Sequence, residues 1–180
     1  EVTETSIGAS VAVLPFVNMS TDPEQEFFSD GISEELLNLL AKIPELRVPA
    51  RTSSFQFKGQ NLDIGDVAEQ LNVDHVLEGS VRKSGVKVRV TAQLIEAETG
   101  YHLWSDTYDR ELDDIFAIQD EISAAIVGAL SETLGLEATV TPTVATATNP
   151  DAYNAYLLGQ HQIKRRTKLD IEAAAGNFER

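Results

Sequence analysis

Cysteine is absent from this 180-residue sequence, which excludes disulfide bonds and thiolate metal ligands. No apolar run comes near the roughly 20 residues that a membrane-spanning helix needs. The sequence also lacks G-x-S-x-G and a glycine-rich phosphate loop, two signatures of hydrolases and nucleotide-binding enzymes. These absences leave little sequence support for a catalytic site, and we expect no cofactor.

Positive charge is scarce as well. Only 14 Lys and Arg residues stand against 29 Asp and Glu residues, so the formal net charge is -15. Nucleic-acid binding requires a positive surface, and a strongly negative chain is repelled by anionic membranes. We therefore expect no contact with nucleic acid and no membrane insertion by this chain.

The apolar pattern predicts an α/β fold with a mixed sheet of about five strands. Residues 10–16 form a short apolar run typical of a buried strand, and residues 46–50 predict a second strand parallel to it. Residues 75–112 predict three antiparallel strands, because residues 87–94 alternate polar and apolar side chains without exception.

Three predicted helices pack on this sheet. They span residues 29–43, 63–71 and 114–134. Their expected first residues, which can cap a helix or complement its dipole, are Ser29, Asp63 and Asp114. Asn72 suits the left-handed conformation that ends the second helix, whereas residues 52–60 predict a loop or short turn that packs one aromatic side chain.

Composition divides the chain into four parts. Their expected boundaries are a flexible N-terminus at 1–9, an α/β domain at 10–136, a linker at 137–148 and a helical hairpin at 149–180. The linker is rich in threonine and small residues and has no period.

Two stretches, residues 11–59 and 73–122, resemble the TolB amino-terminal-domain-like module. The first opens with VAVLPFVNMSTDPEQEFFSDGISEELL, and the second contains HVLEGSVRKSGVKVRV. The module occurs in bacterial class III adenylate cyclases and in membrane-linked winged-helix regulators, upstream of tetratricopeptide repeats. The resemblance implies an α/β fold and a place in a bacterial signalling protein.

The C-terminal residues resemble the first tetratricopeptide repeat of such proteins. Leu158-Gly159 matches the first repeat helix, and Ala174 with Phe178 matches the second, although the spacing between the pairs is longer than standard. One repeat is too few for a stable array. We therefore expect the chain to be a soluble fragment of a longer bacterial protein. One arrangement that fits is the extracytoplasmic part of a membrane-anchored protein.

One face of the predicted meander is a candidate surface for protein contact. A hairpin turn at Ser84-Gly85 and a second turn at 97–100 would bring basic and aromatic side chains together, with Tyr108 opposite Arg89. The candidate residues are Arg82, Lys87, Arg89, Trp104 and Tyr108. Trp, Tyr and Arg are enriched at binding hot spots, but an ordinary solvated face, or a face that a helix covers, is the alternative. The opposite face would carry the core, with Gly79 close to helix 114–134.

The sequence also bears on an anion site and on a metal site. Ser29, Asp30 and Gly31, at the expected helix start, could hold an anion, although capping also explains them. No metal site is predicted, because His75 and His102 would lie on opposite faces and the acidic residues between 106 and 114 lack an EF-hand pattern.

These observations predict a non-catalytic sensing and protein-interaction module, by resemblance part of an adenylate cyclase or a transcriptional regulator. Its partner would be another protein or a second copy in a homodimer. The alternative is a domain that binds a small molecule or nucleotide at the 29–31 helix start and at the carboxyl ends of strands 10–16 and 46–50. An enzyme is the least supported class, because no nucleophile and base stand in a recognisable arrangement.

Overall fold

A computed structural model describes residues 9–134 and Leu158. The expected linker and helical hairpin lie outside the described residues, except that Leu158 packs against the core. Of the expected N-terminal segment, only Ala9 is described, and it is buried.

The sheet has five strands and is mixed, which confirms the predicted fold class. The strands are β1 (Val11–Val13), β2 (Val17–Asn18), β3 (His75–Ser84), β4 (Lys87–Glu96) and β5 (His102–Glu111). Strands β3, β4 and β5 form the predicted antiparallel meander, and β1 and β2 both run parallel to β3 along its other edge.

The prediction of a second parallel strand at residues 46–50 is wrong. Only an isolated bridge joins Ser10 to Arg47, with hydrogen bonds from Val11 N to Arg47 O and from Arg47 N to Ala9 O. Pro49 has no N–H group, so it cannot extend this ladder as a donor. The parallel partner of β1 is β3, which makes the crossover much longer than predicted.

Four α-helices are described. They are α1 (Glu26–Ala41), α2 (Arg51–Phe55), α3 (Ile64–Leu71) and α4 (Ile115–Leu134). Helix α1 begins three residues before Ser29, because Asp22 caps a 3-10 turn at Pro23–Gln25 that leads directly into it. The predicted loop at 52–60 contains α2.

The other helix boundaries follow the sequence closely. Asp63 accepts a 2.8 Å hydrogen bond from Gly65 N at the start of α3. Asn72 ends that helix with φ 51°, the left-handed conformation predicted for it. A 3-10 turn at Leu112–Asp114 precedes α4, which extends to Leu134 as expected.

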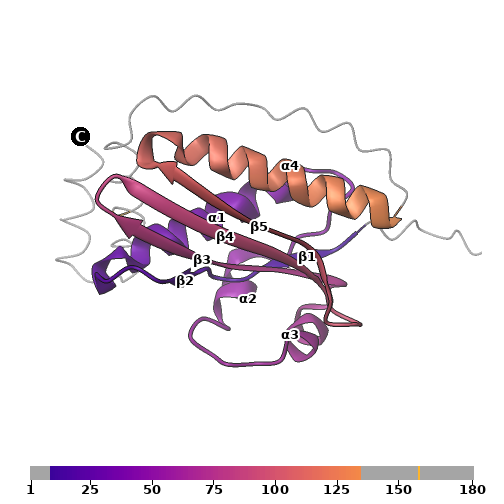
Figure 1. Cartoon of the computed structure of the whole chain (residues 1–180). Helices are drawn as coiled ribbons and strands as arrows, with labels where there is room; N and C mark the ends of the chain where they lie inside the picture. The colour runs from indigo at the N-terminus through magenta and orange to yellow at the C-terminus, as the bar shows by residue number, and fades with distance from the viewer. Residues whose placement is uncertain (1–8, 135–157, 159–180) are drawn as a thin grey trace, which may run out of the picture.

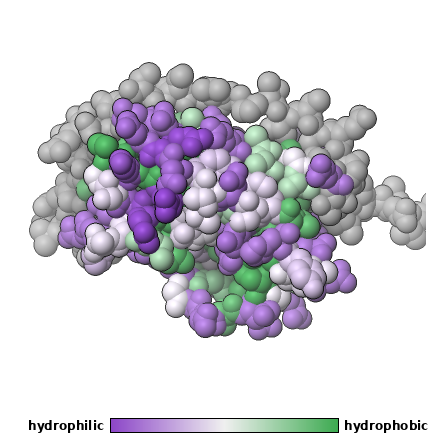
Figure 2. Space-filling view, in the orientation of Figure 1, coloured by the Kyte–Doolittle hydropathy of each residue, from purple (hydrophilic) through white to green (hydrophobic). Residues whose placement is uncertain are grey.

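The helices α1 and α4 share one hydrophobic core with the sheet. Figure 1 shows α1 behind the strands, α4 beside β5, and α2 and α3 below the sheet. Fully buried members of this core are Phe28, Ile32, Leu36, Leu77, Leu94, Ile118, Ile122 and Ile126. The other face, here called the outer face, is mainly hydrophilic or neutral over the strands (Figure 2).

The β3–β4 hairpin turns one position later than predicted. Ser84 pairs with Lys87 around Gly85, which has φ 58°, so Val81 pairs with Val90 and not with Val88. Each β3–β4 pair therefore differs by two residues from the predicted pair. Because side chains alternate between the two faces with a period of two, every side chain of β3 and β4 keeps its predicted face.

The predicted faces of β5 are wrong beyond its first residue, because the register shifts within the strand. Ile95 pairs with His102, which matches the predicted register, but Leu94 pairs with Trp104. The extra residue, Leu103, shifts the rest of β5 by one position, and a shift of one moves every later side chain to the opposite face.

Gly79 lies where a neighbouring segment packs closely on β3. The neighbour is Phe16, not α4 as expected. A Cβ atom at Gly79 would overlap the backbone oxygen of Thr91 and lie 2.7 Å from Phe16 Cε2. Only glycine therefore leaves room for the Phe16 ring, which is 1% exposed.

We predict that Gly79→Ala lowers the free energy of unfolding by about 1–3 kcal/mol through overpacking. The matched control is Gly128→Ala on the exposed side of α4, where no neighbour lies within 4 Å of the added carbon. That change should raise stability by about 0.5–1 kcal/mol through helix propensity. Urea denaturation measures both, and a Gly79→Ala protein as stable as the parent would contradict the described packing.

Candidate protein-interaction surface

Three of the candidate residues lie together on the outer face. Arg82 on β3 is directly opposite Arg89 on β4, and Lys87 lies two residues from Arg89 on the same face. All three side chains are exposed. We call Arg82, Lys87 and Arg89 the outer patch.

Asp109 on β5 neutralises one of these cations. Arg89 Nε and Nη2 donate hydrogen bonds of 2.6 and 3.1 Å to its two carboxylate oxygens. The hydrogen bond and charge of Arg89 lower the pKa of Asp109, and Asp109 raises the pKa of Arg89. Both side chains are more than half exposed, so the ion pair contributes little to stability.

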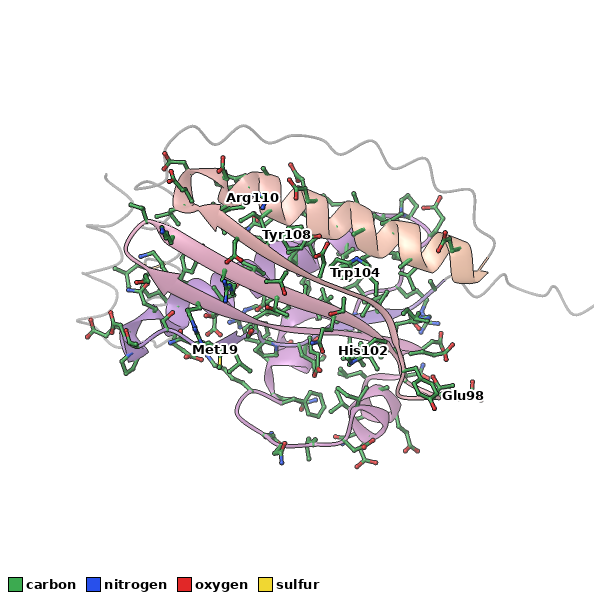
Figure 3. The ribbon with its side chains drawn as sticks, in the orientation of Figure 1. Met19, Glu98, His102, Trp104, Tyr108 and Arg110 are labelled. Atoms are coloured by element: carbon green, nitrogen blue, oxygen red, sulfur yellow. The ribbon has the colours of Figure 1, made fainter. Side chains whose placement is uncertain are left out.

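Trp104 and Tyr108 do not lie on this face, so the predicted basic-aromatic cluster is wrong in its aromatic half. Tyr108 pairs with Val90, is 7% exposed and belongs to the core. Trp104 is half-buried against the same core, and Figure 3 shows both on the side of β5 toward α4. Burial raises the pKa of Tyr108, and the nearby charges of Asp106 and Glu121 raise it further.

Ser29, Asp30 and Gly31 lie in the second turn of α1 and not at a helix start, so the premise of the anion site is wrong. All three residues are buried. Lys58 Nζ contacts both carboxylate oxygens of Asp30 at 2.6 and 2.7 Å, and it lies 2.8 Å from Glu26 Oε1. This group attaches the segment after α2 to α1.

The lysine of this group has a shifted pKa. Burial lowers the pKa of the Lys58 ammonium, but the hydrogen bonds and charges of Asp30 and Glu26 outweigh burial and raise it above its ordinary 10.5. The charged form is therefore the form that the fold stabilises.

A serine, an aspartate and a histidine meet at the entry to β3, which the sequence did not predict. Ser10 Oγ donates a 2.7 Å hydrogen bond to Asp74 Oδ2 and accepts one of 2.8 Å from Asp74 N. His75 Nδ1 lies 3.1 Å from the backbone oxygen of Ser10, not from its hydroxyl. The arrangement therefore joins β1 to β3 and is not a nucleophile-base pair.

His75 and His102, the two described histidines, differ in their surroundings. His75 is buried at the start of β3, whereas His102 is exposed at the start of β5. Within the described ranges, no group of three or more His, Asp or Glu side chains is placed to hold a metal ion.

Two hollows accompany these residues. One lies over the end of the hairpin and includes the outer patch together with Ser84, Asp109 and Glu111. The other, about 200 Å³, lies between Ser10, Arg47 and Asn72, at the amino end of β1. Ligands in open α/β sheets favour the carboxyl ends of strands, so this hollow is not the predicted ligand site.

Two exposed apolar residues adjoin the outer patch, and sequence analysis missed them. Val17 on β2 pairs with Ser80 and is 58% exposed, and Met19, which follows β2, is 50% exposed. Met19 N donates a 2.8 Å hydrogen bond to Val81 O, which places Met19 beside Arg82. The apolar run that suggested a strand ends at Phe16, so nothing in the sequence indicated that residues 17–19 lie beside β3.

The two short parallel strands, the antiparallel meander and the two helices on one face define the class of domain. Residues 7–125 match the family described as HilA/YgeH-like transcriptional regulator, second domain. The chain belongs to this family.

A curated relative and two solved structures are similar to the chain. "Putative adenylate cyclase 3" of Rhizobium meliloti (strain 1021) is 54% identical over 121 residues, which are 67% of this chain and 21% of that protein. TolB from Acinetobacter baumannii has a TM-score of 0.50 at 16% identity, covering 69% of this chain and 29% of TolB. Lipoprotein GNA1162 from Neisseria meningitidis has a TM-score of 0.49 at 19% identity, covering 70% and 99%.

The likeness to TolB shows a shared fold and agrees with the resemblance seen in the sequence. The chain spans about a fifth of the length of the curated relative. Across residues 9–134, none of the helices is long and apolar enough to cross a membrane.

We predict that Lys58→Met lowers the free energy of unfolding by about 1–2 kcal/mol at neutral pH, because the Asp30 carboxylate, 12% exposed, loses its partner. The pKa of Lys58 is higher in the folded chain than in the unfolded chain. Its contribution to stability is therefore complete below pH 10.5 and declines as the pH rises through the raised pKa. The gap between parent and variant should therefore narrow in strong alkali.

Asp30→Asn and the double variant complete the cycle. The double variant should lose less stability than the sum of the two single changes. Additive losses, measured by chemical denaturation, would show that the two side chains do not interact.

Proposed function

We propose that the chain is a non-catalytic sensing and protein-interaction module of a bacterial signalling protein. The observation that carries this proposal is the range of proteins that contain the domain. Its family is described as a domain of a transcriptional regulator. The curated relative is named for adenylate cyclase activity and matches this chain over only 21% of its own length. A domain common to two outputs is better suited to controlling an output than to performing it.

The outer face supports a role in protein contact. It presents the outer patch, with Arg82 and Arg89 side by side, on rigid strands rather than on loops. Arginine is enriched at hot spots of protein interfaces. Trp104 and Tyr108 stabilise the core behind this face and are not part of the proposed contact.

Helix α4 is the proposed route from this contact to the rest of the protein. Its apolar side packs on the sheet through Ile115, Ile118, Ile122 and Ile126, which are all fully buried. A conformational change in the meander would therefore be transmitted directly to α4. The proposed targets are the predicted repeat region and, beyond it, a cyclase or DNA-binding domain. An extracytoplasmic location stays a prediction of the resemblance.

A small-molecule site is not proposed. Its expected location required a helix start at Ser29, and α1 begins at Glu26 with Asp30 engaged by Lys58. The function proposed here needs no such site.

Competition in cells tests the proposal. Production of the chain in Rhizobium meliloti should change cyclic AMP content by about twofold or more, because the chain competes for the partners of its relative. Arg82→Glu with Lys87→Glu should abolish the effect, whereas Lys42→Glu, on the exposed end of α1, should preserve it. An unchanged cyclic AMP content with the parent chain, or equal effects of all variants, would contradict the proposed module.

A further inference from the structure

We propose that the outer patch, together with Met19 and Val17 at its margin, binds an acidic segment of a partner protein that also carries apolar side chains. The inference rests on the proposed function and specifies the chemistry of the partner. Three features carry it: a like-charge pair in which only one member has an ion-pair partner, a local concentration of cations, and exposed apolar side chains beside them.

The like-charge pair is the first feature. Side chains directly opposite on antiparallel strands lie roughly 5 Å apart at Cβ, and like charges there are destabilising. Arg82 and Arg89 occupy such a position. Asp109 pairs with Arg89, but within residues 9–134 no carboxylate forms an ion pair with Arg82 or Lys87, although Glu111 is opposite Lys87 in register.

The fold therefore compensates this pair only at Arg89, and a local rule that is broken in this way is expected at a functional site. An acidic partner would supply the missing compensation. Arg82 is the residue that gains most from such a partner, because Arg89 already has Asp109.

The second feature is the distribution of positive charge. More than half of the Lys and Arg residues between 9 and 134 lie at the hairpin end of the sheet. Arg82, Lys87 and Arg89 are on the outer face, whereas Lys83 and Arg110 pair with Val88 on the other face. The whole chain nevertheless has a net charge of -15. A short acidic segment could reach the outer patch, whereas an extended polyanion would also meet the negative remainder of the surface.

The apolar margin is the third feature, and it selects among anionic partners. Met19 and Val17 are at least half exposed, and Met19 adjoins Arg82. Phosphate groups alone would leave both apolar side chains in water. A peptide segment that combines carboxylates with apolar side chains would cover the cations and the apolar margin together, and so fits this surface better than a nucleic acid does.

The test uses the complete chain and a short fluorescent peptide that alternates glutamate and leucine. The parent chain should bind this peptide, with affinity that falls as salt rises. Arg82→Gln with Lys87→Gln should weaken binding about tenfold or more, and Met19→Ser should weaken it with the salt dependence retained. Lys42→Gln with Arg47→Gln, which removes two cations away from the outer patch, should leave binding unchanged.

Peptide variants and stability separate the proposal from its alternatives. Glutamine in place of glutamate, or serine in place of leucine, should reduce affinity for the parent chain. Arg82→Gln should melt about 1–3 °C higher than the parent, because the like-charge pair is gone, so weaker binding would not reflect unfolding.

Three results would overturn the proposal. They are equal binding by the parent and the Arg82→Gln/Lys87→Gln chain, absence of peptide binding, or stronger patch-dependent binding to a DNA duplex or to phosphatidylserine vesicles than to the peptide. If peptide binding fails while competition in cells succeeds, the partner chemistry is wrong and the module function stands. If the peptide binds as expected and competition fails, the module function is wrong.

Discussion

The structure depends on β3 being paired along both edges. On one side, ten residues of β3 form an antiparallel ladder with β4. On the other, β1 and β2 add in parallel, which requires the chain to return from Val13 to His75 through three helices. Such a long closure has an entropic cost. The Ser10–Asp74 hydrogen bonds at the entry to β3, and the packing of Phe16 over Gly79 further along, help to offset it.

A single extra residue in β5 determines the character of both faces of the sheet. Because Leu103 is inserted opposite the Leu94/Ile95 step, Trp104 and Tyr108 face the core while Asp109 faces Arg89. Without the bulge, two aromatic rings would be exposed beside three cations. With it, the aromatic residues stabilise α4 against the sheet, and the outer face retains cations and the exposed side chains of Val17 and Met19.

The surface left by this arrangement is unusual for such an acidic chain. At the hairpin end, the cations of the outer face lie on β3 and β4, and the carboxylates of Asp109 and Glu111 face them from β5. This end of the outer face is therefore positive toward β2 and negative toward its β5 edge. A surface of this kind favours one orientation of a charged partner. The same strands pack against α4 from behind, which connects the proposed contact to the C-terminal direction of the chain.

The sequence determined the features that depend on local pattern. The alternation at 87–94 predicted β4, Asp63 and Asn72 marked both ends of α3, and the faces of β3 and β4 survived a turn misplaced by one position. The early start of α1 is also local, because Asp22 caps the turn that leads into the helix. Two features were decided by tertiary structure. Residues 46–50 form only a bridge, on the edge of β1 away from β3, and the bulge at Leu103 reversed the faces of β5. Each is a choice between pairings that are locally similar, and only packing against the whole sheet distinguishes them.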